Sequence, residues 1–198
     1  MTVISTLSFD QVEIMENIMT LHCPNGFELD PTYSKGVFYK CGRIPQPKHK
    51  FDLFPKTEDT KKASAEKLPL WNCEVSSIMF DPPFVAGHTK DKPTGLIGER
   101  FHGFPYVSDL WKWYELCLKE FYRVLKKGGK LVFKCQDTVS SGKQWFSHVH
   151  IINEAEKLGF YTKDLFILQA KSRMIGHNHG NQIHARKFHS YFIVFEKK

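Results

Sequence analysis

Apolar residues recur along the chain with two different spacings, and each spacing predicts one kind of element. Over residues 8–22, 109–125 and 144–158 they recur every three to four positions, which is the period of one face of an α-helix. Shorter apolar runs predict strands, and these runs lie at residues 27–30, 50–54, 77–81, 130–137, 164–170 and 190–195. Strands that alternate with helices in this order indicate an α/β fold with a largely parallel sheet.

Polar residues and glycines at the ends of these runs predict where the helices begin and end. Ser8 and Gln11 have the spacing of a capping box, and Ser108 stands where the second helix needs an N-cap residue. Gly128 and Gly159 are expected to end the second and third helices. The elements fit one domain over residues 1–198, in which residues 1–26 form an N-terminal helical segment.

Residues 77–84 join an apolar strand to an acid, two prolines and an aromatic ring. The strand is apolar on both faces, as in a parallel sheet that is covered on both sides. Pro82 and Pro83 have no N–H group to donate, so the strand must end at Asp81. Open α/β sheets bind their ligands at the carboxyl ends of their strands, and Asp81 is therefore predicted to face a ligand.

The groups after this strand suit the chemistry of an exocyclic amine on a nucleobase. Such an amine is a poor nucleophile because its lone pair is delocalised into the ring. A carboxylate and a backbone carbonyl can accept hydrogen bonds from its two N–H groups, and the ring of Phe84 can stack on the base. The alternative is that Asp81 only caps a Pro-Pro turn.

Asp81-Pro82-Pro83-Phe84 resembles the catalytic tetrapeptide of the S-adenosylmethionine-dependent amino-methyltransferases, which act on adenine N6 or cytosine N4. The likeness is greatest to small DNA methylases of the bacterial or phage type. It implies that these four residues are catalytic and that S-adenosylmethionine is the cofactor. It also implies a Rossmann-like, seven-stranded class I methyltransferase sheet with an antiparallel last strand, and residues 123–133 resemble the helix, turn and strand of that fold.

A second motif, one strand earlier, resembles the segment with which this family holds its cofactor. The family motif is roughly Asp-Pro-Phe-x-Gly-Ser-Gly, and residues 30–36 keep a reduced form with one glycine. In such folds an acid at the end of the next strand binds the cofactor ribose, and Asp52 is the candidate, with Glu58 and Asp59 as alternatives. Ser64 stands where the family has an acid near the cofactor adenine. The implied cofactor-binding residues are Asp30, Pro31, Tyr33, Ser34, Gly36, Asp52 and Ser64.

Composition and charge indicate which class of molecule the chain is expected to bind. The chain has 28 basic and 21 acidic side chains, a net charge of +7 and a pI of about 9.1, which favours a polyanion such as nucleic acid. The five cysteines show no CxxC spacing, so a reducing compartment is expected and structural zinc is not. Acids in the first turns argue against a signal peptide, and no apolar run would span a bilayer. We expect a cytoplasmic protein without membrane contacts.

Two polar segments are expected to face the substrate. Residues 85–108 follow the tetrapeptide directly, and a loop of this length inside a compact domain is usually functional. Residues 171–189 carry basic side chains and histidines but no acid, which is typical of phosphate contacts rather than of a metal site. The alternative is that both segments are solvated loops. The predicted substrate-binding residues are Lys90, Arg100, Gln136, Lys171, Arg173, Arg186 and Lys187.

These features together predict an S-adenosylmethionine-dependent DNA (adenine-N6) methyltransferase. One rival is an RNA adenine-N6 methyltransferase, because the tetrapeptide does not distinguish the two nucleic acids. Another is a non-catalytic nucleic-acid-binding subunit with the same fold, which the single glycine and Ser64 favour. An oxidoreductase is disfavoured, since no G-x-G-x-x-G occurs. Sequence specificity is expected from the two loops, from the second copy in a homodimer or from a partner chain.

Overall fold

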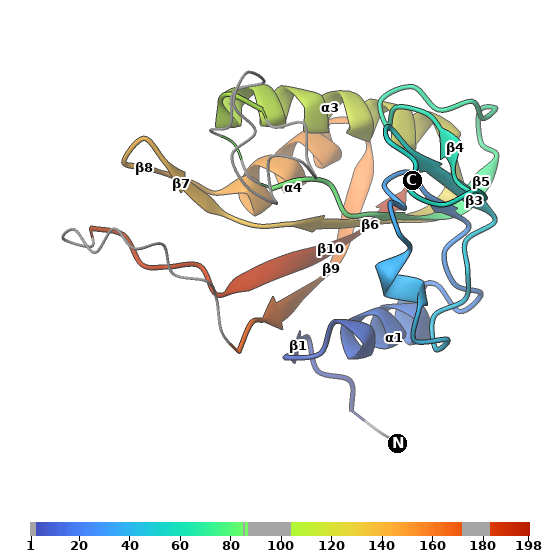
Figure 1. Ribbon diagram of the computed structural model, residues 1–198, viewed down its shortest axis with the longest axis horizontal. Helices are drawn as coiled ribbons and strands as arrows, with labels where there is room; N and C mark the ends of the chain where they lie inside the picture. The colour runs from blue at the N-terminus through green and yellow to red at the C-terminus, as the bar shows by residue number, and fades with distance from the viewer. Residues whose placement is uncertain (1–2, 85, 87–103, 172–182) are drawn as a thin grey trace.

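The computed structural model describes residues 3–84, 86, 104–171 and 183–198, which form an eight-stranded sheet with helices on both faces (Figure 1). The helices are α1 (Gln11–His22), α3 (Val107–Val124) and α4 (Ser147–Lys157), with a 3-10 turn η1 (Val37–Tyr39). The strands of the sheet are β1 (Leu7–Ser8), β2 (Leu29–Asp30), β3 (His49–Asp52), β4 (Lys61–Lys62), β5 (Val75–Phe80), β6 (Leu125–Cys135), β9 (Phe160–Gln169) and β10 (His189–Lys197). Within these residues, no helix has the length and apolar character that crossing a membrane requires.

The strands lie in the order β1-β9-β10-β6-β5-β2-β3-β4. β10 is antiparallel to both of its neighbours, and the other neighbouring strands are parallel. The prediction of a class I methyltransferase sheet with an antiparallel last strand is therefore confirmed. The two-residue strand β1 is an addition, which lengthens the sheet at the β9 edge beyond the seven predicted strands.

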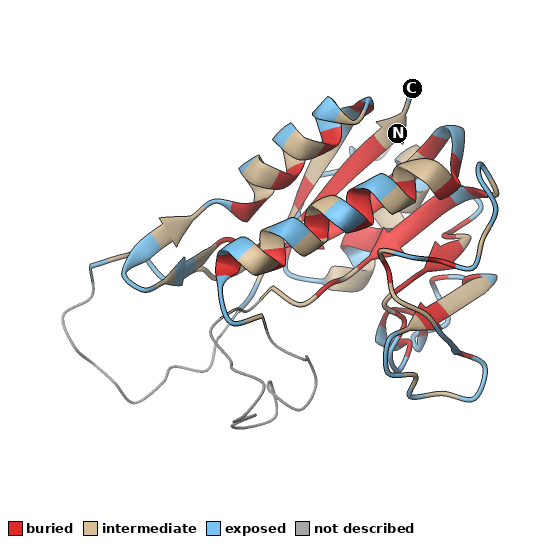
Figure 2. Cartoon of the chain, turned by 90° about the horizontal axis from the view of Figure 1, so that it is seen from above, coloured by how far each residue is buried: buried red, intermediate tan, exposed pale blue. Residues whose placement is uncertain are grey.

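Two apolar cores lie on opposite faces of this sheet. Helices α3 and α4 cover one face, and α1 with η1 covers the other (Figure 1). Along β5, Ile78 and Phe80 pack into the core under α3, while Met79 between them packs into the core under α1. The buried positions of α3 form a stripe along the helix (Figure 2), as its three-to-four spacing predicts. Coverage of both faces explains why β5 carries consecutive apolar residues at Ile78, Met79 and Phe80.

The predicted N-cap residues of α1 and α3 are wrong, because each helix begins at a different residue from the one predicted. α1 begins at Gln11, and the carboxylate of Asp10 accepts a hydrogen bond from the N–H of Val12 at 2.8 Å. Ser8 lies in β1 instead, and its hydroxyl donates to the side chain of Glu13. α3 begins at Val107, so Ser108 lies inside this helix and does not cap it.

Gly128 does not end helix α3 either. The helix ends at Val124, and Leu125 already pairs with Val75 as the first residue of β6. Leu125 is fully buried, so the chain turns into the sheet at that point. Gly128 has a φ of +77°, and the pairing of β6 with β5 shifts register over this stretch. A left-handed backbone inside an irregular strand is what requires a glycine there.

A β-hairpin takes the place of the first turn of the predicted third helix. β7 (Thr138–Ser140) and β8 (Lys143–Trp145) pair in antiparallel fashion, and α4 begins only at Ser147. Ser141 and Gly142 connect the two strands with φ values of +52° and +72°. Two consecutive positive φ values are typical of the tight turn of a two-residue hairpin. The prediction of helix at residues 144–146 is therefore wrong.

Candidate active site

Three acids lie at the carboxyl ends of neighbouring parallel strands. Asp30 and Asp52 are the last residues of β2 and β3, and Asp81 follows β5 directly. Parallel strands end at the same edge of a sheet, so their acids face a common region. The predicted placement of Asp81 at the end of its strand agrees with the structure to within one residue.

Asp30 is the most deeply buried of these acids, with 2% of its surface exposed. One carboxylate oxygen, Oδ2, accepts a hydrogen bond from the hydroxyl of Tyr39 at 2.8 Å, and Oδ1 accepts one from the N–H of Thr32 at 2.9 Å. Burial nevertheless raises the pKa of Asp30 to about 7; the nearby Asp81 carboxylate contributes to this rise, and the hydrogen bonds from Thr32 and Tyr39 oppose it. Asp30 therefore changes its charge near neutral pH.

Thr32 joins the two acid-bearing turns. Its hydroxyl accepts a hydrogen bond from the backbone N–H of Asp81 at 3.0 Å and donates to Asp30 Oδ1 at 3.4 Å. The side chain of Thr32 thus fixes the start of the Asp81 turn relative to Asp30. The two hydrogen bonds of Thr32 therefore restrict the movement of one acid relative to the other.

Asp81 has one carboxylate oxygen in a hydrogen bond and one without. The ammonium of Lys134 lies 3.3 Å from Oδ2 with the geometry of a hydrogen bond, and 3.2 Å from Oδ1. Oδ1 is buried and accepts no hydrogen bond from any residue that the structure describes. Burial raises the pKa of Asp81, and the positive charge of Lys134 opposes that rise. Oδ1 therefore has hydrogen-bond accepting capacity that no described residue uses.

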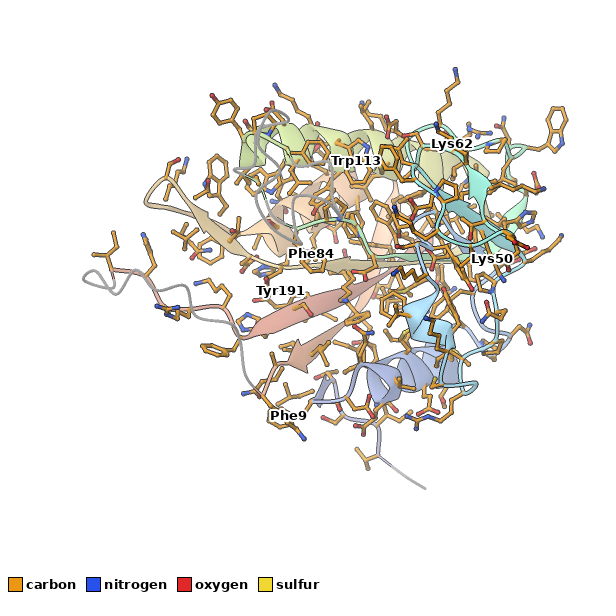
Figure 3. The ribbon with its side chains drawn as sticks, in the orientation of Figure 1. Phe9, Lys50, Lys62, Phe84, Trp113 and Tyr191 are labelled. Atoms are coloured by element: carbon orange, nitrogen blue, oxygen red, sulfur yellow. The ribbon has the colours of Figure 1, made fainter. Side chains whose placement is uncertain are left out.

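The turn after Asp81 is held from helix α3. The hydroxyl of Tyr114 donates a hydrogen bond to the carbonyl oxygen of Pro83 at 2.6 Å. Only 1% of Tyr114 is exposed, so its position is fixed by the surrounding core and it holds the Pro83 carbonyl in place. Phe84 then lies near the centre of the view in Figure 3, partly buried, with the ammonium of Lys134 at 5.5 Å from its ring centre. Pro82, by contrast, is buried.

The residues of the predicted cofactor motif mostly pack against one another. Tyr33 is buried, donates its hydroxyl hydrogen bond to Gln46 at 2.6 Å and stacks on Tyr39. Gly36 has a φ of +60°, and a Cβ atom there would clash with the ring of Tyr33. The glycine therefore makes room for Tyr33, which gives it a structural reason besides the predicted approach of a cofactor. Pro31 is also buried.

Asp52 ties the same turn to the next strand. Its Oδ2 accepts a hydrogen bond from the N–H of Ser34, and its Oδ1 accepts one from the N–H of Phe54, both at 2.8 Å. The N–H of Ala63 donates to the backbone carbonyl of Asp52 at 3.1 Å, which brings Ser64 to this edge. The structure thus gathers Asp30, Asp52 and Ser64 at one edge of the sheet.

The predicted substrate-binding residues fall into two groups. Gln136 follows β6 and donates a hydrogen bond from its side chain to the carbonyl of His189 at 2.7 Å. Lys171 and Arg186 are exposed, and Lys187 is half-buried, on the segments that follow β9 and precede β10. These segments and Gln136 lie at the same carboxyl edge as Asp81, because β9 runs parallel to β6 and β10 antiparallel. Lys90, Arg100 and Arg173 lie outside the described residues.

Sequence reasoning missed four residues that shape this site: Thr32, Tyr39, Tyr114 and Lys134. Lys134 carried a usable signal, because it interrupts the apolar run of the strand Leu131–Cys135. A buried lysine needs a partner, but its identity depends on the register of β6 against β5. Tyr114 and Tyr39 gave no such signal, since their aromatic spacing is that of ordinary core residues.

Comparisons with known proteins are consistent with this arrangement. Residues 75–198 match the model of a family described as DNA methylase, of the N6/N4 type. The matched part includes Asp81, Phe84 and Lys134 but not the cofactor motif at residues 30–36. No curated protein matches the chain.

The chain is similar to several solved structures. TrmN from Thermus thermophilus matches with a TM-score of 0.54 and 14% identity over 94% of this chain and 49% of its own. A SAM-dependent methyltransferase from Thermotoga maritima matches with a TM-score of 0.50 and 19% identity over 93% and 87%. A candidate DNA modification methylase, also from Thermus thermophilus, has 17% identity and a TM-score of 0.49 over 75% and 54%. The chain thus spans about half the length of the first structures that it matches.

Proposed function

The chain belongs to the N6/N4 DNA methylase family, whose methyl donor is S-adenosylmethionine, and we propose that it transfers the methyl group to an exocyclic amine of DNA, with adenine N6 as the target. The observation that carries the proposal is the Asp81 carboxylate, whose Oδ1 is buried without a hydrogen-bond donor from the described residues. A target amine has an N–H group to fill that position.

The bound donor supplies a methyl group on a positively charged sulfur, which an amine accepts without a metal or a covalent enzyme intermediate. Asp30 suits a positively charged ligand, because it is an acid whose surroundings are largely shielded from water. Asp52 suits the ribose hydroxyls, since each of its oxygens retains a lone pair beyond its backbone hydrogen bond. Gly36 contributes space for Tyr33.

Asp81 and Phe84 have separate tasks in this proposal. The Asp81 carboxylate accepts a hydrogen bond from the target amine and favours a nitrogen with a localised lone pair. The Phe84 ring stacks on the base and holds its plane. A base within a duplex cannot reach this turn, so it must be flipped out of the helix at a cost of a few kcal/mol. Stacking and phosphate contacts offset that cost.

Phe84→Ala should lower methyl transfer by about 5- to 150-fold, because stacking of one base on an aromatic ring contributes about 1–3 kcal/mol. Phe84→Tyr is the matched control and should stay within about threefold of the wild type, since it keeps the aromatic face. Initial rates of methyl transfer on one DNA substrate measure both variants. Equal rates for the Ala and Tyr variants would show that stacking at Phe84 plays no part.

The segment before β10 is proposed to contact the phosphate backbone. Arg186 and Lys187 lie there, and the side chain of His184 in the same segment contacts the carbonyl of Gly142 at 2.8 Å, next to Lys143 of the β7–β8 hairpin. Figure 1 shows the hairpin and this segment extending from the same side of the molecule. Their basic side chains form a surface suited to a polyanion.

Arg186→Ala combined with Lys187→Ala should flatten the slope of log affinity against log salt concentration by nearly two units on duplex DNA. Each lost phosphate contact removes about 0.9 of that slope because fewer counterions are released. Lys126→Ala with Lys127→Ala is the charge-matched control at the opposite edge of the sheet, where both lysines are exposed, and it should leave the slope unchanged. An unaltered slope for the first pair would place the DNA-binding surface elsewhere.

The test of the proposed function is incubation with labelled S-adenosylmethionine and separate pools of DNA and RNA. Label in the DNA pool supports the proposal, and label only in the RNA pool favours the RNA methyltransferase. Label in neither pool, with no donor binding by calorimetry, favours the non-catalytic subunit.

A further inference from the structure

Lys134 is a buried lysine at the candidate site that no step of the proposed reaction uses. It belongs to β6, 8% of its surface is exposed, and its side chain lies on the α1 face of the sheet with Val132 and Phe192. Long charged side chains are almost never buried to this degree unless they are paired. Its partners therefore indicate what the charge is for.

The ammonium of Lys134 has two polar partners and three aromatic ones. It donates a hydrogen bond to Oδ2 of Asp81 and another to the side-chain oxygen of Gln11, the latter at 2.9 Å. The ring centres of Phe38, Phe84 and Phe192 lie 5.1, 5.5 and 5.4 Å away. Gln11 begins α1 and Phe38 lies in η1, so the ammonium is held from three sides in one position.

The contact with Asp81 is divided between the two carboxylate oxygens. Oδ2 has the hydrogen bond from Lys134, while Oδ1 is buried and accepts none from the described part of the chain. The ammonium lies 3.2 Å from Oδ1 and 3.3 Å from Oδ2, so it is close to both oxygens, but only its contact with Oδ2 has the geometry of a hydrogen bond. This arrangement fixes the carboxylate through one oxygen and leaves the other one for a further donor.

We infer that Lys134 is a positioning residue for the methyl transfer: it orients Asp81 through Oδ2 and keeps the carboxylate ionised, so that Oδ1 can accept the hydrogen bond of the target amine. The inference rests on the proposed function. A neutral Asp81 would carry a proton on one oxygen and would accept a weaker hydrogen bond from an N–H group.

Four ionisable groups from the surrounding elements interact electrostatically with Asp81. Asp30 at the end of β2 carries a like charge when ionised, while Tyr39 of η1 and Tyr114 of α3 are buried phenols whose pKa values burial raises well above the ordinary range. The fourth group is Lys134, whose charge lowers the pKa of Asp81 against the effect of burial. Lys134 is the one cation among these four groups.

Lys134→Met keeps an unbranched apolar side chain among the three rings and removes the charge. The pKa of Asp81 should then rise by about one unit or more, because an opposite charge at this distance lowers a carboxyl pKa by about 1–3 units. The acid limb of kcat/KM against pH should move to higher pH by the same amount, and Lys134→Arg should bring it back. A purely structural lysine would change the plateau or the stability and leave the limb in place.

Lys130→Met is the matched control on the same strand. Lys130 forms an ion pair with Glu196 at 3.1 Å, is partly buried and lies near the middle of β6, away from Asp81. Its replacement should leave the acid limb unmoved. Lys134→Gln, which can still donate to Oδ2 without a charge, replaces the Met variant if that one does not fold, and its limb should also move.

Titration of the Asp81 carboxyl carbon by NMR separates this inference from the proposed function, because it needs no activity. A higher titration midpoint in Lys134→Met together with a shifted limb supports the role of Lys134. An active wild type whose limb and midpoint do not change in the variant overturns it, as does a variant that is faster than the wild type at all pH values. An inactive wild type contradicts the proposed function, and the NMR midpoint alone then decides whether Lys134 keeps Asp81 ionised.

Discussion

Asp81→Ala should lower methyl transfer by about 100-fold or more and leave the affinity for S-adenosylmethionine within about tenfold, or about 1.4 kcal/mol. The reason is that Oδ1 of Asp81 is the buried acceptor proposed to meet the target amine, whereas the donor is proposed to contact mainly Asp30 and Asp52. Single-turnover rates and calorimetric donor affinity measure the two effects separately. Methyl transfer at the wild-type rate by Asp81→Ala would contradict the assignment of Asp81 as a catalytic residue.

The same substitution leaves the ammonium of Lys134 without its carboxylate, and breaking such a pair can cost about 3–5 kcal/mol of stability. A control for folding is therefore necessary. Asp81→Asn keeps the size and one oxygen acceptor but not the charge, and Asp81→Asn with Lys134→Met removes both charges together. Both variants should bind the donor and show the same loss of transfer. A loss of donor binding in all of them would indicate unfolding instead of a catalytic defect.

The ligand-free protein should lose stability as the pH rises from about 4 to about 7, and Asp30 should be a main cause. Burial raises the pKa of Asp30 from 3.8 to about 7, so the folded state binds the proton more tightly than the unfolded state. Between these pH values the folded state holds more protons, and the free energy of unfolding falls with increasing pH. At about 1.4 kcal/mol for each unit of pKa, the loss is at most about 4 kcal/mol.

Asp30→Asn should remove this component, because the amide keeps an oxygen for the N–H of Thr32 and cannot ionise. The variant should be more stable than the wild type at pH 8 and not at pH 4, as measured by urea unfolding across the pH range. Asp59→Asn is the control, since Asp59 is exposed and its pKa is lowered by Lys50. If the difference in unfolding free energy between Asp30→Asn and wild type does not depend on pH, the pKa of Asp30 is the same in the folded and unfolded states, and the prediction is wrong.

The free-energy cost of ionising Asp30 in the folded protein would be offset when a positively charged ligand binds. An acid that destabilises the empty protein at neutral pH would gain a partner when a positively charged ligand binds, and binding sites commonly carry such strain. We propose that this is why a carboxyl group stands at the end of β2 where an amide would give a more stable fold.

The sequence predicts the placement of Asp81 well, because the two prolines allow only one end for the strand. It also predicts the fold, since strand and helix periods are local properties of the chain. The roles of Thr32 and Lys134 depend on contacts between distant segments. Lys134 meets Asp81 only through the register of β6 against β5, in which Phe133 lies beside Phe80. That register, and with it the contact, cannot be derived from either strand alone.

Gly36 has a clear local sequence signal, but the structure gives that glycine a different role. Its place in the motif predicts a close approach of backbone and cofactor, yet the ring of Tyr33 takes up the space beside it. Asp30 is similar, because its burial depends on Tyr39 of η1 folding back over β2. The N-caps of α1 and α3 differ from prediction for a simpler reason: several polar residues near each helix start can serve, and the choice among them is made by packing.

The most direct test of the central claim is mass-spectrometric identification of the methylated nucleoside after reaction of DNA with S-adenosylmethionine that carries a deuterated methyl group. We expect the label on the exocyclic nitrogen of adenine with the wild-type protein, and none with Asp81→Ala. Label on a ring carbon of cytosine, or the same amount of N6-labelled adenine from Asp81→Ala, would contradict the account.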